Sequence, residues 1–342
     1  MNIKLESLVS VIMPLYNCEL YVKEAIESVL SQSFNNFELI IVDDHSTDNS
    51  MQVAKSIVDE RIRIVDSSPH KGQAHQLNMA LQHCRGTYIA IAHSDDINMH
   101  DRLKLQVEYL KAHLNISIVG THMEYFYPNG DRKCVLMNTD SVFVTGDLLF
   151  YCTVNHPSVM IRKNVLLSKP YLYDQSYVPC EDYLLWVQLA MDRCIIGNVD
   201  YVGVAYRMHD NQISKTKAEL TKEHDKQIQE LLFTSVFPFL QLSDLHKFYP
   251  LFHISANSRI TASYLKFIRS VRKQLGVNSK IDNNLWRSWL DERTIIALKS
   301  SANLSVGAGW YHLYMNPGHI FKLGFRKTLS ILFKPLFKNG NN

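Results

Sequence analysis

The sequence predicts an α/β fold: a doubly wound, mostly parallel sheet followed by a helical C-terminal region. Three observations support this class. Apolar runs alternate with amphipathic stretches over the first hundred residues, further short strands follow from about 116 to 215, and helical periodicity dominates beyond that point. We therefore expect two domains, 1–215 carrying the sheet and 216–342 mostly helical.

Each expected strand of the first hundred residues is a short run rich in β-branched residues, and each expected helix gathers apolar residues on one face. The continuous apolar run at 37–44 is typical of a strand buried on both faces of a parallel sheet. Strands that alternate with helices imply right-handed, parallel connections. The strands are expected at 8–16, 37–44, 61–65 and 87–92, and the helices at 21–30, 46–59 and 72–84.

The region from about 116 to 215 mixes short strands in 117–127 and 199–209 with a helix that begins near Cys180. A turn is expected at 128–130, where Pro, Asn and Gly follow one another.

Composition excludes several classes of protein. Lys and Arg number 36 and Asp and Glu 33, so the net charge of +3 does not indicate a nucleic-acid binder. The six cysteines form no C-x-x-C pair, which argues against a zinc ribbon or a disulfide framework and favours reduced thiols. No apolar stretch approaches the about 18 to 20 residues of a membrane span, and the N-terminus does not read as a signal peptide. We expect a cytoplasmic protein.

Residues whose side chains could bind a ligand or take part in catalysis lie where the expected strands end. Pro14, Tyr16 and Asn17 follow the first strand, Asp43-Asp44 the second and Asp95-Asp96 the fourth. Ligands of open α/β sheets bind beyond the carboxyl ends of the strands, so these groups are expected to converge on one edge.

Asp95 and Asp96 are adjacent carboxylates that raise each other's pKa unless a cation neutralises them. A hard divalent cation does so, and Mg²⁺ is usually held by one or two carboxylates together with substrate phosphates. Taken alone, the pair also fits a second role, because negative charge stabilises the N-terminus of a following helix.

Several motifs in sequence order resemble family 2 glycosyltransferases, which have the Rossmann-like GT-A fold. They are VSVIMPLYN, LIIVDDHSTDNS and KGQAHQLNMALQHCRGTYIAIAHSDD, then NHPSVMIRK, CEDYLLWVQLA and YRMHDNQIS, and together they cover residues 7 to 215. The resemblance implies an inverting transferase that uses a UDP-sugar donor, a saccharide or lipid-linked acceptor, and Mn²⁺ or Mg²⁺.

The resemblance also implies roles for single residues at the donor side. Tyr16 would stack on the uracil base, Asp43 would accept a hydrogen bond from it, and Asp44 would support the neighbouring loop. Asp95 would meet the ribose or the metal, and Asp96 would ligate the metal directly. The other donor-side residues are Pro14 and Asn17, which shape the uridine pocket, and Lys71, which would reach the phosphates. Without the motif, a Tyr at a strand end is packing and a lone Lys is solvated.

The acidic motif departs from the family at one position. Members commonly read Asp-x-Asp-Asp after the fourth strand, whereas this chain has His93 first. His93 is either a packed residue satisfied by a backbone hydrogen bond or a nitrogen donor that shifts metal preference toward Mn²⁺.

The Glu-Asp motif at Glu181-Asp182 implies that Asp182 is the base that deprotonates the acceptor hydroxyl, with Glu181 supporting the helix start. Outside that context, both carboxylates would cap the helix. His156, Arg207 and His209 fall where relatives line the acceptor or close a loop over the donor.

The tail from 317 to 338 places Lys327, Lys334 and Lys338 opposite an apolar face formed by Phe321, Phe325, Leu329, Leu332 and Leu336. This pattern fits a helix on an anionic membrane surface, although a helix packed on the protein's own core has the same pattern. We expect peripheral attachment to the inner face of the plasma membrane.

These observations favour a glycosyltransferase of bacterial surface polysaccharide synthesis, such as O-antigen or capsule. A sugar-nucleotide pyrophosphorylase would need a Gly-rich loop after the first strand and a dehydrogenase a G-x-G-x-x-G motif, and the sequence has neither. The alternative is a nucleotide-binding GT-A scaffold without transfer activity, for which His93 is the hint.

Overall fold

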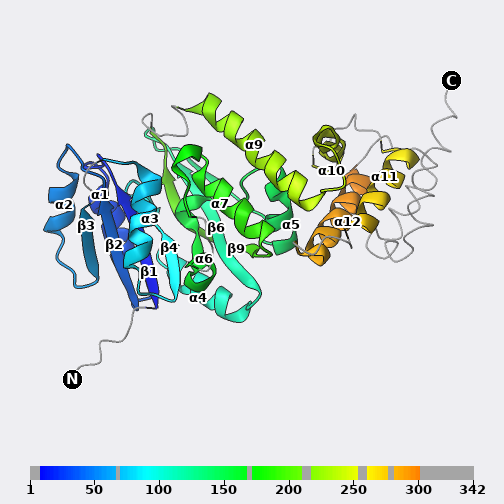
Figure 1. Cartoon of the computed structure of the whole chain (residues 1–342). Helices are drawn as coiled ribbons and strands as arrows, with labels where there is room; N and C mark the ends of the chain where they lie inside the picture. The colour runs from blue at the N-terminus through cyan, green and yellow to red at the C-terminus, as the bar shows by residue number, and fades with distance from the viewer. Residues whose placement is uncertain are drawn as a thin grey trace. The chain divides into compact units, whose positions relative to one another are not determined.

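The computed structural model describes residues 8–66, 70–167, 172–209, 217–252, 260–275 and 281–300. The chain divides into two compact units, Met1–Gln229 and Glu230–Asn342 (Figure 1). The division into domains near residue 215 stays a prediction. The tail segment 317–338 lies outside the described residues.

The N-terminal half of the sheet has the predicted parallel α/β arrangement. Four strands lie in the order β3-β2-β1-β4, and every neighbouring pair among them is parallel. The strands β1 and β2 are buried along their whole length, as their apolar runs require. These strands and the helices between them are β1 (Val9–Leu15), α1 (Val22–Leu30), β2 (Phe37–Asp43), α2 (Ser50–Ser56), β3 (Ile62–Asp66), α3 (Gln73–His83) and β4 (Tyr88–Ile91).

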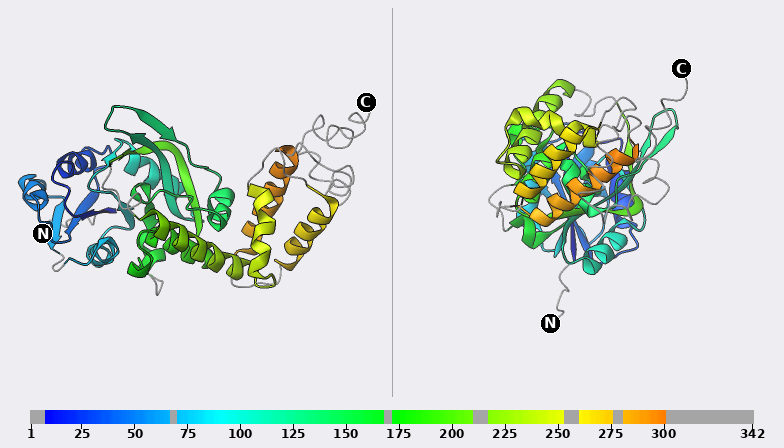
Figure 2. Two further views of the ribbon diagram at one scale, coloured as in Figure 1. Left: turned by 90° about the horizontal axis from the view of Figure 1, so that it is seen from above. Right: turned by 90° about the vertical axis from the view of Figure 1, so that its right-hand side faces the viewer.

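The other half of the sheet is mixed. Strand β8 (Met160–Arg162) pairs antiparallel with β4 and with β6 (Ile116–Phe126), and β6 pairs parallel with β9 (Ile195–Arg207). The short strands β5 (Ile97–Asn98) and β7 (Arg132–Val135) add antiparallel pairs with β9 and β6. The left view of Figure 2 shows β6 and β9 side by side. Strands β6 and β9, which the sequence analysis expected to be short, are 11 and 13 residues long.

Four further helices belong to the first unit. They are α4 (Arg102–Ala112), α5 (Ser141–Gly146), α6 (Lys163–Leu167) and α7 (Glu181–Met191), with short 3₁₀ turns at Asp147–Leu149, His156–Ser158 and Gln175–Tyr177. The helix predicted to begin near Cys180 is α7, for which Cys180 is the N-terminal flanking residue.

The described part of the second unit is helical, as predicted for the C-terminal region. Helix α9 (Ala218–Val236) leads into it, followed by a 3₁₀ segment (Leu242–Phe248), α10 (Tyr249–Phe252), α11 (Ala262–Gln274) and α12 (Asn283–Ser300). A cluster of buried aromatic residues forms its core: Phe233, Phe237, Phe248, Trp286 and Trp289.

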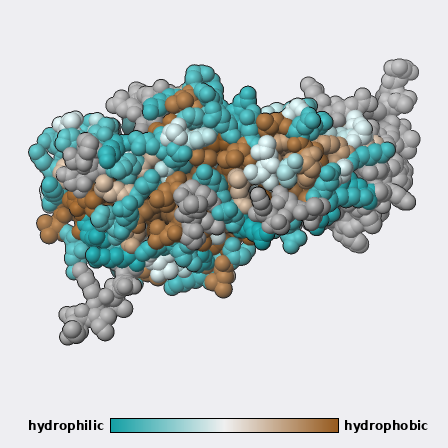
Figure 3. Space-filling model, in the orientation of Figure 1, coloured by the Kyte–Doolittle hydropathy of each residue, from teal (hydrophilic) through white to brown (hydrophobic). Residues whose placement is uncertain are grey.

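The face drawn in Figure 3 carries hydrophilic residues interspersed with hydrophobic ones. Within the described ranges, none of the helices combines the length and the apolar character that crossing a bilayer requires.

Candidate active site

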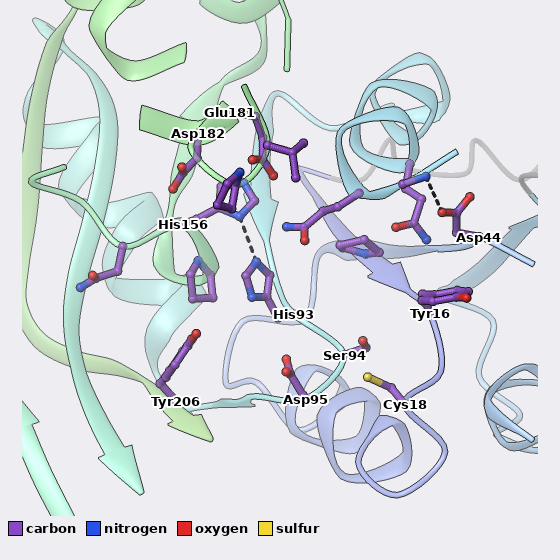
Figure 4. A pocket seen from close by; sticks show the side chains of 18 of the residues that line it. Tyr16, Cys18, Asp44, His93, Ser94, Asp95, His156, Glu181, Asp182 and Tyr206 are labelled. Carbon is purple, nitrogen blue, oxygen red and sulfur yellow. Dashed lines mark hydrogen bonds between the residues drawn. The ribbon is translucent and has the colours of Figure 1, made fainter. Parts of the chain in front are cut away.

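A cavity of about 880 Å³ opens at the carboxyl edge of β1 and β4. It contains ten of the residues that the sequence singled out: Pro14, Tyr16, Asn17, Asp44, His93, Asp95, His156, Glu181, Asp182 and His209. Figure 4 shows Tyr16 and Asp44 on one side of the cavity and Glu181 and Asp182 on another, with His93 and His156 between them. Four other predicted residues, Asp43, Lys71, Asp96 and Arg207, do not line the cavity wall.

The end of β1 supplies an aromatic platform. Tyr16 is 42% exposed, and its ring stacks on His70 with 4.4 Å between ring centroids. The next residue, Asn17, has φ +48°, a conformation that Asn tolerates better than most residues. Its side-chain oxygen accepts a hydrogen bond from the Thr47 N–H at 2.8 Å, which ties the end of β1 to the loop after β2. An exposed aromatic face held in this way can stack on a planar base.

The two carboxylates after β2 have different surroundings. Asp43 is buried and accepts hydrogen bonds from the Ser46 N–H and hydroxyl. Asp44 lines the cavity and accepts hydrogen bonds from the N–H groups of Lys71 at 2.9 Å and Gly72 at 2.6 Å, so it holds the loop before α3. The side chain of Lys71 is exposed. The loop-supporting role expected of Asp44 matches these contacts, whereas the roles of Asp43 and Lys71 toward a donor stay predictions.

Asp96 is almost fully buried, and one of its two carboxylate oxygens has a hydrogen-bond partner. Its Oδ1 accepts a hydrogen bond from the Arg207 N–H at 2.9 Å, while its Oδ2 has no hydrogen-bond partner among the described residues. Burial, together with the neighbouring charge of Asp95, raises the pKa of Asp96 well above its usual value. A buried carboxylate oxygen without a partner is costly unless a cation or a proton satisfies it.

Asp95 is held by residues from the end of β9. Its carboxylate lies 3.0 Å from His209 Nε2, and its carbonyl oxygen accepts a hydrogen bond from Arg207 Nε at 3.0 Å. Burial acts against ionisation of Asp95, but the hydrogen bond with His209 and the neighbouring imidazoles outweigh it, so the pKa of Asp95 is lowered. The Arg207 guanidinium also lies over the rings of Tyr21 and Phe126. Arg207 and His209 thus fix the conformation of the loop that carries Asp95 and Asp96.

His93, Asp95 and Asp96 form a cluster that fits a divalent metal. One ligand atom from each lies within 4.8 Å of the others. The Asp96 Oδ2 has no hydrogen-bond partner among the described residues, and two carboxylates with one imidazole suit Mn²⁺ or Mg²⁺. The residues present therefore fit the metal expected from the sequence.

Two histidines link this cluster to the rear of the cavity. His93 Nε2 lies 2.9 Å from His156 Nδ1, the contact dashed in Figure 4, and His156 Nε2 lies 3.2 Å from the Tyr173 hydroxyl. Burial lowers the pKa of both imidazoles, most strongly that of His156. Both rings are consequently neutral near pH 7.

Glu181 and Asp182 begin α7 and carry the second acidic pair. Burial and the charge of Asp182 raise the pKa of Glu181 to about 8, and its Oε2 has no hydrogen-bond partner among the described residues. Burial also raises the pKa of Asp182 to about 6, and the charge of Asp225 on α9 adds to this effect. At pH 7 Asp182 is mostly ionised and Glu181 mostly protonated. Such a pair presents one base beside a neutral acid.

Some residues in or next to the cavity wall were not anticipated from the sequence. Tyr173 and His70 had no local signal, because each acquires its role from a partner distant in the chain. Gln76 on α3 donates to the carbonyl oxygens of Leu15 and Val42, both at 2.7 Å, and so joins the ends of β1 and β2.

The parallel half-sheet, the acidic pair at its edge and the second acidic pair across the cavity fit the GT-A fold that the sequence motifs imply. Comparison with known proteins agrees. Residues 10–161 match the family model described as Glycosyl transferase family 2. The chain belongs to this family and is a glycosyltransferase.

Relatives and solved structures support this placement. The chain is 31% identical over 220 residues to the UDP-Glc:alpha-D-GlcNAc-diphosphoundecaprenol beta-1,3-glucosyltransferase WfgD of Escherichia coli, covering 64% of this chain and 84% of the relative. It is 28% identical over 210 residues to WfaP of Escherichia coli, whose name gives the same activity, and the match covers 61% of this chain and 81% of the relative. The S. aureus TarS 1-349 structure in complex with UDP-GlcNAc superimposes with a TM-score of 0.58 over 97% of this chain and 92% of that one. At 16% identity, the likeness to TarS shows a shared fold.

Proposed function

We propose that this chain is an inverting, metal-dependent glycosyltransferase that moves a sugar from a UDP-sugar to a hydroxyl of a saccharide or lipid-linked acceptor. The observation that carries the proposal is that Asp95 lines the same cavity as the acidic pair Glu181 and Asp182, together with the exposed Tyr16 ring. The names of the Escherichia coli relatives, which specify UDP-Glc and a diphosphoundecaprenol acceptor, support this donor and acceptor class.

The donor side would hold the nucleotide through stacking and charge. The exposed Tyr16 ring offers a face for the uracil, with Pro14 and Asn17 beside it. Asp96 and Asp95 would hold the metal, whose positive charge would stabilise the diphosphate leaving group. Arg207 contributes by holding the acidic loop, because its backbone N–H donates to the Asp96 carboxylate and its guanidinium donates to the backbone carbonyl oxygen of Asp95.

The acceptor side would supply the base. Asp182 is in its ionised form near neutral pH and lines the same cavity, so it can take the proton from an acceptor hydroxyl. Glu181, protonated at the same pH, adds little negative charge next to that base. Direct displacement with one base needs no covalent intermediate, and it gives a product whose anomeric configuration is opposite to that of the donor.

We further propose that the enzyme acts in bacterial surface polysaccharide synthesis at the inner face of the plasma membrane. The activities named for the relatives and the basic, apolar sequence at 317–338 support this setting. Removing residues 317–342 should abolish binding to vesicles that contain anionic lipid. Full binding by the truncated protein would refute the membrane role of the tail.

The transfer itself is tested with UDP-glucose and other UDP-sugars, Mn²⁺, and an acceptor carrying N-acetylglucosamine on a polyprenyl diphosphate. One donor should give a product with inverted anomeric configuration by NMR, and Asp182→Asn should abolish it. Asp131→Asn, at an exposed turn, is the matched control and should keep the parental rate. UDP binding without transfer to any acceptor would instead favour a binding scaffold.

A further inference from the structure

His93 stands where the family pattern has a carboxylate, yet its ring is held between a buried acid and a second imidazole. We propose that His93 is a nitrogen ligand of the metal through Nδ1, and that His156 and Tyr173 are positioning residues that fix its ring and tautomer. This inference deepens the proposed function and rests on its metal-binding part.

The distances suit a shared ion. His93 Nδ1 lies 3.7 Å from Asp96 Oδ2, the oxygen that has no hydrogen-bond partner among the described residues. Two ligands at about 2.1 Å from one ion lie between about 3.0 Å and 4.2 Å apart in an octahedral site. The separation is too long for a hydrogen bond and falls within the range of two ligands of one ion. The separation of the two atoms is therefore compatible with one shared cation.

The other nitrogen of His93 determines which tautomer is present. Two ring nitrogens 2.9 Å apart must share one proton, so His93 Nε2 and His156 Nδ1 cannot both carry one or both lack one. A metal on His93 Nδ1 requires a free lone pair there, so the ring proton sits on Nε2 and is donated to His156. His156 then carries its own proton on Nε2 and donates it to the Tyr173 oxygen. His156 and Tyr173 thus supply the successive hydrogen-bond acceptors that a neutral, metal-binding His93 needs.

The end of this chain is anchored in the protein interior. His156 is buried and packs against the edges or faces of Tyr173 and Trp186. Tyr173 is buried as well, and its backbone exchanges two hydrogen bonds with the Asn78 side chain on α3, at 2.8 and 3.1 Å. The His93 ring therefore cannot rotate away from Asp96 without breaking the hydrogen bonds that connect it to His156 and Tyr173.

The alternative is that His93 is a packed residue satisfied by His156 alone. That alternative leaves the buried Asp96 Oδ2 without a hydrogen bond among the described residues, although His93 Nδ1 lies 3.7 Å from it. A nitrogen ligand accounts for both atoms at once. It also predicts a stronger preference for Mn²⁺ over Mg²⁺ than an all-oxygen site would have.

Pulsed electron paramagnetic resonance of Mn²⁺ in the presence of UDP tests the ligand directly, because a coordinated imidazole gives a ¹⁴N modulation. His209 is a second imidazole next to Asp95, so the experiment is carried out in a His209→Gln background. We expect the ¹⁴N signal to persist in His209→Gln and to vanish when His93→Gln is added. Bound Mn²⁺ without a ¹⁴N signal in His209→Gln, or a signal that survives in the double variant, would overturn the inference.

The positioning role has its own readout. Tyr173→Phe keeps the ring and removes the hydroxyl, so it should weaken Mn²⁺ affinity about tenfold and change the ¹⁴N coupling while the fold is retained. His93→Asp should reduce the Mn²⁺ to Mg²⁺ preference at least several-fold. Unchanged affinity and coupling in Tyr173→Phe would refute the positioning role. If the parent protein binds no Mn²⁺ at all, the metal part of the proposed function fails too; bound Mn²⁺ without His93 coordination overturns this inference only.

Discussion

The pH dependence of transfer should show an acidic limb that belongs to Asp182. Burial raises the pKa of this carboxyl from 3.8 to about 6, partly offset by hydrogen bonds from backbone N–H groups. Because the ionised form is the base, kcat/KM should rise with pH through about 6. A single group with that pKa is ionised about 10% at pH 5, about 50% at pH 6 and about 90% at pH 7. An ordinary aspartate would already be more than about 90% ionised at pH 5.

The assay is the initial rate of UDP release at subsaturating donor between pH 4.5 and 8, with acceptor present and Mn²⁺ fixed and saturating. Under these conditions kcat/KM reports ionisation of the free enzyme. Asp182→Asn should lower the rate by about 10²- to 10⁴-fold at every pH. Asp225→Asn should move the limb to lower pH, because it removes a negative charge that raises the pKa of Asp182.

Two results would refute this reasoning about Asp182. One is a profile that stays flat down to pH 4.5 in the parent protein. The other is an Asp182→Asn variant that keeps more than about a tenth of the parental rate, since general base catalysis contributes far more than that. Asp131→Asn serves again as the control, because it changes an exposed carboxylate at a turn.

Three further perturbations have definite expected outcomes. Asp96→Asn should abolish Mn²⁺ binding in calorimetry, because it removes the charge of the buried carboxylate that would ligate the metal; parental Mn²⁺ affinity would contradict this. Tyr16→Ala should weaken UDP affinity by about 1–3 kcal/mol, the value of one base stack, whereas Tyr16→Phe should bind like the parent, and equal affinities in all three would exclude stacking. Arg102→Met should lower the free energy of unfolding in urea by about 3–5 kcal/mol, since it deprives the carbonyls of Ile91 and Val159 of a buried charged donor; a change below about 1 kcal/mol would contradict it.

Much of the first half of the fold could be predicted because its signals are local. The apolar runs that form β1, β2 and β4 are each bounded by turn residues or carboxylates, and the helices between them carry apolar residues at helical spacing. The functional side chains follow directly from these boundaries, because parallel strands deliver their carboxyl ends to one edge. Asp95 and Tyr16 therefore meet in one cavity, as expected.

The remainder depends on pairings between distant parts of the chain. Strand β8 has three residues and inserts antiparallel between β4 and β6, so no sequence period identifies it. The length of β9 comes from its pairing with β6, which continues through irregular register. The contact of His93 with His156 joins residues 63 positions apart. Partners of this kind become visible only once the sheet order is known.

The most direct test of metal-dependent use of a UDP-sugar is hydrolysis of a panel of UDP-sugars by the purified protein with Mn²⁺, with Mg²⁺ and with chelator. The account predicts slow release of UDP from one donor, dependent on metal and lost in Asp96→Ala, while Asp131→Asn behaves as the parent. No hydrolysis of any donor under any metal, with UDP binding unaffected by Asp96→Ala, would contradict it.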